Sequence, residues 1–246
     1  MRLRRSSTGG RPSYRAPIDQ RNAEANDFGI AAELCPENPV SPDPTARGFQ
    51  SHLLDDPTHV VGIGASAGGL QALKLLLPRF TMDCTAFVVI MHLAPERTSL
   101  LASILARRTR MSVATAKHDQ ILRKNSIYVI PPGVILTLTA EGRLRSSSLP
   151  PTHPRWTIDR FFSSLSEIGR ASIGIILSGT GTDGTKGLKE IQARGGTTFV
   201  QAPDSAEYPQ MPRSAQAFAD HCLEPGDLGD VLMRTVGAGL QGESSP

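Results

Sequence analysis

The stretch Val60–Leu70, with the sequence VVGIGASAGGL, limits the possible folds more than any other part of the chain. Its first residues are apolar and mostly β-branched, which predicts the end of a buried strand. The glycines then allow a tight turn, and leucines at spacings of three and four predict a helix that runs to Pro78. Ser66 therefore lies at a strand–turn–helix junction, a unit typical of α/β proteins.

The local pattern of this junction permits three interpretations. The first is a simple turn without chemistry. The second is a dinucleotide site, because Gly62, Gly64 and Ala67 fit GxGxxG/A. The third is a nucleophile turn, because residues 64–68 also fit GxSxG. A dinucleotide site needs an acidic residue at the end of the second strand, where this chain has Met91-His92-Leu93. The rest of the chain has to decide between the other two.

Composition and charge narrow the class of protein. The chain has 246 residues, enough for one large domain or two small ones, and its net charge of +3 is too small to indicate a nucleic-acid partner. Cys35, Cys84 and Cys222 are far apart and form no CxxC pair, which argues against a zinc site or a disulfide framework. No apolar run is long enough for a membrane helix, and no apolar segment follows the basic first residues. We expect a cytoplasmic protein without membrane insertion, metal or cofactor.

The chain changes character near residue 57. Residues 1–56 carry scattered prolines and almost no apolar periodicity, so we expect a disordered N-terminal tail with a short helical turn near residues 30–34. We expect one folded domain over residues 57–238. The last residues, 239–246, are polar and predict a flexible C-terminal tail.

Strand and helix patterns alternate along the folded region. Predicted strands cover residues 85–91, 126–130, 173–177 and 197–200, with a short apolar segment at 111–114. Predicted helices cover residues 100–108, capped by Thr98 or Ser99, and 157–168, 185–193, 214–219 and 228–236. Residues 134–139 and 144–147 predict a β-hairpin, while 150–154 and 203–213 predict loops. This alternation favours an α/β fold with a doubly wound, mostly parallel sheet, helices on both faces in three layers, and a small β-hairpin.

Three polar residues, Ser66, His92 and Asp183, each follow a predicted strand. Because the carboxyl ends of parallel strands share one edge of the sheet, these side chains can meet there. A serine becomes a nucleophile when an adjacent imidazole takes its proton, and a carboxylate on the other ring nitrogen orients that imidazole. Each residue also has a structural alternative, because Ser66 and Asp183 suit helix caps and His92 suits a strand end. Their joint placement favours a catalytic triad.

Four motifs around these residues together resemble the catalytic domain of the chemotaxis protein-glutamate methylesterases (CheB). They are Val61–Leu70, His92–Pro95, Leu177–Gly184 and Gln210–Ser214, in that order, and the resemblance runs from about residue 58 to about residue 236. The resemblance implies an α/β domain with a Ser–His–Asp triad. The triad would consist of Ser66, His92 and Asp183.

The resemblance also implies a reaction and a substrate. Members hydrolyse glutamate methyl esters on the cytoplasmic helices of chemoreceptors, and some also deamidate glutamines. Backbone N–H groups near Thr180 and His92 would hold the oxyanion, and Ala67, Met211 and Arg213 would contact substrate. The implied partners are methylated chemoreceptor helices and a partner methyltransferase.

The chain departs from the family pattern at four points. Ala67 stands where many members have Thr, Thr180 where many have Met, and Gln210 where the late motif has Gly. Residues 1–56 are too short and polar for the receiver domain that usually precedes the catalytic domain. The GASAGG form of the serine motif resembles methylesterase modules that are fused to methyltransferases or stand beside them. A non-catalytic module that binds a receptor or methyltransferase, and an esterase for another substrate, remain alternatives.

Overall fold

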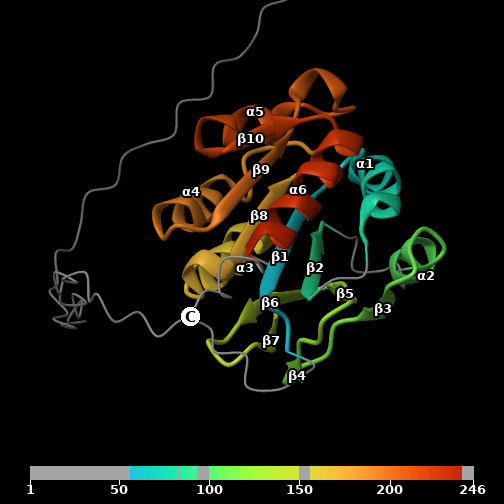
Figure 1. The fold of residues 1–246 in the computed structure, drawn as a ribbon, viewed down its shortest axis with the longest axis vertical. Coiled ribbons are helices and arrows are strands. Elements are labelled where there is room, and N and C mark those ends of the chain that lie inside the picture. The colour runs from blue at the N-terminus through green and yellow to red at the C-terminus, as the bar shows by residue number, and fades with distance from the viewer. Residues whose placement is uncertain (1–55, 82–83, 93–99, 150–155, 240–246) are drawn as a thin grey trace, which may run out of the picture. The chain divides into compact units, whose positions relative to one another are not determined.

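The computed structural model describes residues 56–81, 84–92, 100–149 and 156–239. Seven strands form one sheet in the order β10-β9-β8-β1-β2-β5-β3, and every neighbouring pair is parallel (Figure 1). The strands are β1 (His59–Ala65), β2 (Thr85–Met91), β3 (Ser112–Thr115), β5 (Ser126–Val129), β8 (Ser172–Ile176), β9 (Thr197–Gln201) and β10 (His221–Leu223). The predicted doubly wound parallel sheet is therefore confirmed.

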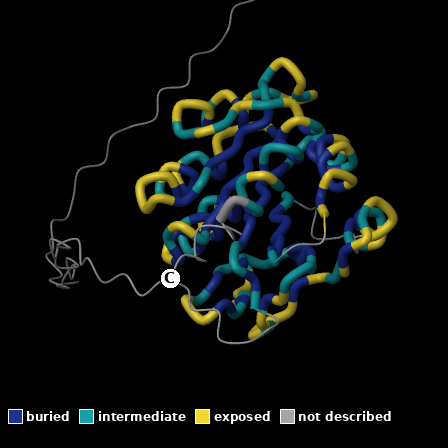
Figure 2. The backbone as a smooth tube through the Cα atoms, viewed as in Figure 1, coloured by how far each residue is buried: buried dark blue, intermediate teal, exposed yellow. Residues whose placement is uncertain are grey.

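Helices cover both faces of this sheet. One face carries α3 (Thr157–Ser166) and α4 (Thr185–Ala193), and the other carries α1 (Gly69–Leu76), α2 (Leu101–Ala106) and α6 (Pro225–Gly239). Neighbouring strand residues alternate between the two sides, so that Val60 packs with α3 and Val61 packs with α1 and α6. The central strands are buried on both sides (Figure 2), as expected for a parallel sheet between two helical layers.

The order of the strands creates a topological switch point beside β1. From β1 the chain adds β2 beside it and β3 at the edge of the sheet, inserts β5 between them, and then places β8 on the opposite side of β1. The parallel register pairs Ala65 with Met91 and Gly64 with Ile176, so the three strands end close to the same level. Ligands of open α/β sheets bind at such a point, outside the carboxyl ends of the strands.

A second, antiparallel sheet contains β4 (Gln120–Ile121), β7 (Arg143–Ser148) and β6 (Val134–Leu138). The predicted hairpin is confirmed, with Leu138 opposite Leu144. Its strands rest on α3, where the N–H of Leu138 donates to Ser164 Oγ at 2.9 Å. The two residues of β4 were not predicted, because so short a segment shows no alternation.

The late part of the chain differs most from the predicted elements. The predicted loop 203–213 instead contains a 3-10 turn, Pro203–Ser205, and helix α5 (Gln210–Ala215). The prediction of a loop was wrong there, because Pro212 lies in the first turn of α5, where proline is tolerated. The predicted helix over 214–219 is the end of α5 and a 3-10 turn, Gln216–Phe218. Strand β10 was also missed.

Some predictions fall on parts of the chain outside the described residues. These are the N-terminal tail up to residue 55, the cap at Thr98 or Ser99, the loop 150–154, and residues 240–246 of the C-terminal tail. Within the described ranges, no helix combines the length and apolar character needed to cross a bilayer.

Candidate active site

Ser66 follows β1 directly, in a turn that the neighbouring strand fixes. The N–H of Ser66 donates to the carbonyl of Ser178 at 3.0 Å, and the carbonyl of Ser66 accepts the N–H of Gly69 at 3.0 Å. Gly68, which caps α1, has a φ of 74°, a left-handed conformation that glycine adopts without steric cost. These hydrogen bonds hold the backbone of Ser66. The residue is half-buried, so it still reaches the surface.

His92 follows β2 and lies between Ser66 and Asp183. Its Nδ1 is 3.2 Å from Ser66 Oγ, and its Nε2 is 2.8 Å from Asp183 Oδ2. An ionised carboxylate only accepts hydrogen bonds, so Nε2 carries the proton and Nδ1 accepts from the Ser66 hydroxyl. The His92 side chain is 15% exposed and that of Asp183 is 6% exposed. This geometry suits transfer of the serine proton to the imidazole during nucleophilic attack.

Asp183 is held by the start of α3, not by the helix that follows it. Its Oδ2 accepts the N–H of Ile158 at 3.0 Å, and its Oδ1 accepts the N–H of Asp159 at 2.9 Å. The cap of α4 is Gly184, without a side-chain cap bond. The first-turn N–H groups of α3 and its positive dipole end therefore face the ionised carboxylate and stabilise its charge.

Asp159 makes the reciprocal contact, and sequence reasoning missed it. Its Oδ1 accepts the N–H of Gly187 in the first turn of α4 at 2.9 Å. Burial raises the pKa of the Asp159 carboxyl, with a further contribution from the negative charge of Asp183, while hydrogen bonding opposes the rise. Asp159 and Asp183 thus tie the starts of α3 and α4 together. An acidic residue in the first turn of a helix normally suggests that it caps that same helix. The sequence gives no sign that Asp159, in the first turn of α3, instead accepts an N–H from α4.

The backbone N–H groups near Ser66 differ in whether they already donate a hydrogen bond. The N–H of His92 donates to the carbonyl of Ala65 at 3.4 Å, a long hydrogen bond. The N–H groups of Thr180 and Ala67 have no acceptor among the described residues. In GxSxG turns the residue after the nucleophile supplies an oxyanion N–H. That position here is Ala67, so the motif itself held a signal for this role.

Met211 and Arg213 lie on α5 but in different surroundings. Met211 is fully buried, and its N–H donates to the carbonyl of Gly179 at 3.1 Å. A Cβ at Gly179 would overlap Met211 Sδ and stand 2.9 Å from Ser66 Cβ. The structure therefore brings Met211 close behind the serine. Arg213 is exposed, and its guanidinium has no hydrogen bond or ion pair within the described part of the chain.

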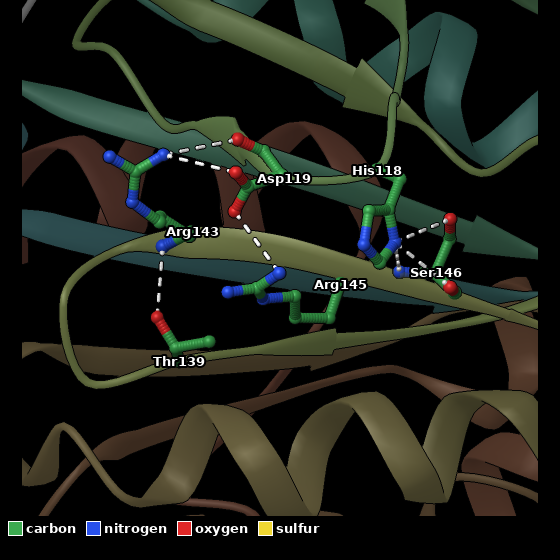
Figure 3. A network of polar contacts seen from close by, with 6 residues as sticks. All are labelled: His118, Asp119, Thr139, Arg143, Arg145 and Ser146. Atoms are coloured by element: carbon green, nitrogen blue, oxygen red, sulfur yellow. Dashed lines mark hydrogen bonds and ion pairs between the residues drawn. The ribbon is translucent and has the colours of Figure 1, made fainter.

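A second serine–histidine contact occurs on the small sheet, but it lacks an orienting acid. His118 Nδ1 lies 3.4 Å from Ser146 Oγ and closer to the backbone of Ser146, 3.1 Å from N and 3.0 Å from O (Figure 3). The adjacent Asp119 contacts Arg143 at 3.6 Å and Arg145 at 3.3 Å instead. These contacts join the turn before β4 to β7, a structural role.

Two hollows lie near the three triad candidates. The hollow beside His92, lined in part by Met91 and Pro132, encloses only about 20 Å³, room for about one water. A larger groove of about 820 Å³ lies between the first turns of α3 and α4. No group of three or more histidines, cysteines or acids among the described residues could hold a metal ion.

Comparisons with known proteins place these observations in a family. The model of the CheB methylesterase family matches residues 61–232. A protein-glutamate methylesterase/protein-glutamine glutaminase of Symbiobacterium thermophilum is 32% identical over 217 residues, 85% of this chain and 60% of that protein. Protein-glutamate methylesterase FrzG of Myxococcus xanthus is 34% identical over 214 residues, 84% of this chain and 64% of that protein. The chain thus spans less than two thirds of either relative.

The architecture agrees with a solved relative. The crystal structure of the Thermotoga maritima CheB methylesterase catalytic domain superposes with a TM-score of 0.67 at 26% identity, covering 72% of this chain and 98% of that one. The family model spans β1 to α6, which includes the turn of Ser66, the end of β2 and the loop of Asp183. Sequence, sheet order and superposition agree, and the chain belongs to the CheB methylesterase family.

Proposed function

We propose that this chain is a serine esterase that hydrolyses glutamate methyl esters on the cytoplasmic signalling helices of chemoreceptors. The observation that carries the proposal is the contact chain from Ser66 Oγ to His92 Nδ1, 3.2 Å, and from His92 Nε2 to Asp183 Oδ2, 2.8 Å. It supplies a nucleophile, a base and an orienting carboxylate within reach of one another. The names of the relatives support the substrate class. The reaction would take place in the cytoplasm, with a receptor methyltransferase as partner.

In this reaction Ser66 Oγ attacks the ester carbonyl carbon while His92 Nδ1 takes the serine proton. The tetrahedral intermediate collapses when the bond to the methoxy oxygen breaks, and His92 returns the proton so that methanol leaves. Water then attacks the acyl-enzyme and gives a proton to His92. His92 passes that proton to Ser66 Oγ as the product leaves as a glutamic acid side chain, which then releases its carboxyl proton to solvent. A glutamine side chain would follow the same steps with ammonia as the leaving group.

Negative charge develops on the carbonyl oxygen during both attacks and needs fixed N–H donors. We assign this role to the N–H groups of Thr180 and Ala67, which have no acceptor among the described residues. The N–H of His92, whose bond to Ala65 is 3.4 Å long, is the third candidate. Because the donors are backbone groups, the side chains of Thr180 and Ala67 can differ from the common family residues without loss of the donor. Met211 and Arg213 are proposed as substrate contacts.

The variant Ser66→Ala tests the proposal. The full chain is incubated with receptor signalling fragments methylated by the host's methyltransferase, and methanol release is measured. We expect release by the wild type and a loss of about 10⁴-fold or more in the variant, with an unchanged circular dichroism spectrum. Turnover retained in Ser66→Ala would contradict the proposal.

A serine-reactive phosphonate probe separates the alternatives if the wild type releases no methanol. Labelling of Ser66 would then indicate an esterase for another substrate. Absence of labelling in a folded protein would favour a module that binds a receptor or methyltransferase without catalysis.

A further inference from the structure

The large groove between α3 and α4 is rich in cations and rings. It lies between Trp156 and Arg160 of the α3 start, Lys186 and Lys189 of α4, and Phe218. Trp156 is 44% exposed, although large aromatic side chains are mostly covered in folded proteins. A hollow of about 820 Å³ is large enough to receive several side chains of a bound polypeptide.

The charge of the groove is positive on the side open to solvent. The Lys186 side chain is 78% exposed, and its one ion pair among the described residues is with Glu190, 3.8 Å away on the same helix. Lys189 Nζ stands 5.5 Å over the centre of the Phe218 ring. The guanidinium of Arg160 has no ion pair or hydrogen bond among the described residues. Asp159 is the one acid among the described residues of the lining, and its Oδ1 accepts the N–H of Gly187.

One end of the groove lies at the edge of the sheet that carries the triad candidates. Thr182, which lines it, directly precedes Asp183, and the N–H of Asp159 donates to Asp183 at 2.9 Å. The hollow beside His92 encloses only about 20 Å³, so its walls offer little area to hold a large substrate. A protein substrate must therefore gain much of its binding free energy on neighbouring surfaces.

We propose that this groove binds an acidic stretch of the substrate polypeptide beside the reacting ester. Arg160, Lys186 and Lys189 face its carboxylates, and the rings of Trp156 and Phe218 pack against its apolar side chains. The inference rests on the proposed function, because hydrolysis converts each neutral methyl ester into a carboxylate. Binding therefore strengthens as neighbouring glutamates are demethylated and weakens as salt screens the charges.

The first test measures binding without turnover. Trp156 is the only tryptophan of the chain, so its emission reports on the groove alone. A glutamate-rich helical peptide is titrated into the full-length Ser66→Ala protein, with a lysine-rich peptide of equal length as control. We expect a saturable, salt-sensitive change in emission with the acidic peptide only. The double variant Lys186→Glu/Lys189→Glu, combined with Ser66→Ala, should weaken binding about tenfold.

The second test measures the substrate step in the full chain with active Ser66. For each variant, the rate with the methylated receptor fragment is divided by its rate with a small ester, p-nitrophenyl acetate, which is too small to fill the groove. For the methylated receptor fragment, Lys186→Glu/Lys189→Glu should raise KM about tenfold and change kcat little. Arg108→Glu/Arg110→Glu is the matched control, because it makes the same charge change beside Phe80, on the opposite face of the sheet. Its KM should equal that of the wild type.

The outcomes separate this inference from the proposed function. Equal KM values in the two double variants, or no emission change with the acidic peptide, overturn the groove assignment even if Ser66 is the nucleophile. An emission change that charge reversal weakens supports the groove even if the receptor fragment is not the substrate. Equal weakening by both double variants would show an effect of net charge and would overturn the assignment.

Discussion

Gly179 controls how closely the loop before Asp183 approaches Ser66. A Cβ at this position would overlap Met211 Sδ and lie 2.9 Å from Ser66 Cβ, so one of these neighbours would have to move. We expect Gly179→Ala to lower kcat/KM for a small ester by about 10²-fold, because a displacement of about 1 Å in a reacting group has that effect. The measurement is the steady-state rate, together with the melting temperature.

Gly181 offers a matched control in the same loop. Its φ of 83° makes alanine unfavourable by about 1–2 kcal/mol, but a Cβ there would meet no atom within 4 Å. Gly181→Ala should therefore lower the melting temperature while kcat/KM stays near the wild-type value. Equal losses of activity in the two variants would show that backbone strain in the loop, and not the approach to Ser66, controls the rate.

At the scale of elements, Asp183 links the triad candidates to helix α3. Two first-turn N–H groups of α3, those of Ile158 and Asp159, donate to its carboxylate. We expect Asp183→Ala to lower the free energy of unfolding by about 1–2 kcal/mol, because these donors lose their partner. Ser66→Ala removes no such partner and should leave that free energy within about 0.5 kcal/mol. Urea unfolding of both variants measures the difference, and equal stabilities would contradict the capping role.

Asp159, on α3, makes the stability of the folded chain depend on pH. Burial raises the pKa of its carboxyl above 3.8, and the charge of Asp183 adds to the rise. A carboxyl whose pKa is raised by folding binds its proton more tightly in the folded state, so its contribution to stability falls as pH rises through the folded pKa. Asp159→Asn keeps an oxygen acceptor for the N–H of Gly187 without the charge. We expect the stability of the wild type relative to Asp159→Asn to fall from pH 3.8 upward.

Urea unfolding of both proteins at a series of pH values checks this expectation, and the difference between them cancels the titration of groups that do not interact with Asp159. Asp159→Ala separates charge from capping, because it also removes the acceptor and should cost about 1 kcal/mol more than Asp159→Asn. A difference that rises with pH would show that hydrogen bonds to the ionised form outweigh its burial.

Elements with strong local patterns were predictable, and those set by tertiary contacts were not. The buried strand β2 is a nearly continuous apolar run, the amphipathic helix α3 has clear apolar periodicity, and both begin at the predicted residues. Strand β10 has three partly exposed residues, so it exists only through its pairing with β9. The start of α5 depends on contact with Gly179. The contact of Asp159 with α4 spans 28 positions, beyond any local pattern.

At the scale of the molecule, sheet topology brings the three triad candidates together. Ser66, His92 and Asp183 follow β1, β2 and β8, which are neighbours in the sheet although β8 is far along the chain. Their meeting at one edge could be predicted because parallel strands share a carboxyl edge. Their distances could not, because these depend on how α3 packs over the sheet and holds Asp183. The candidate site is thus a product of the whole sheet.

Because the site depends on the whole sheet, a change in the core beneath it should affect activity. Phe162 of α3 is fully buried against the sheet. A Cβ at Gly62 would stand 2.8 Å from its ring, and one at Gly174 would stand 3.6 Å away, so the ring packs directly on β1 and β8. Phe162→Ala should lower the free energy of unfolding by about 3–5 kcal/mol, out of a total of about 5–15 kcal/mol for a typical domain. Because the ring supports β1 and β8, its effect on activity should come through unfolding of the sheet.

We therefore expect urea to abolish small-ester hydrolysis and the circular dichroism signal of Phe162→Ala at one midpoint, lower than the shared midpoint of the wild type. Both midpoints should shift together because Ser66, His92 and Asp183 are held by three strands of one cooperative unit. Activity lost well before the circular dichroism signal would mean that the loop of Asp183 unfolds locally. In that case the contacts of Asp183 with α3, and not the sheet, would set the stability of the site.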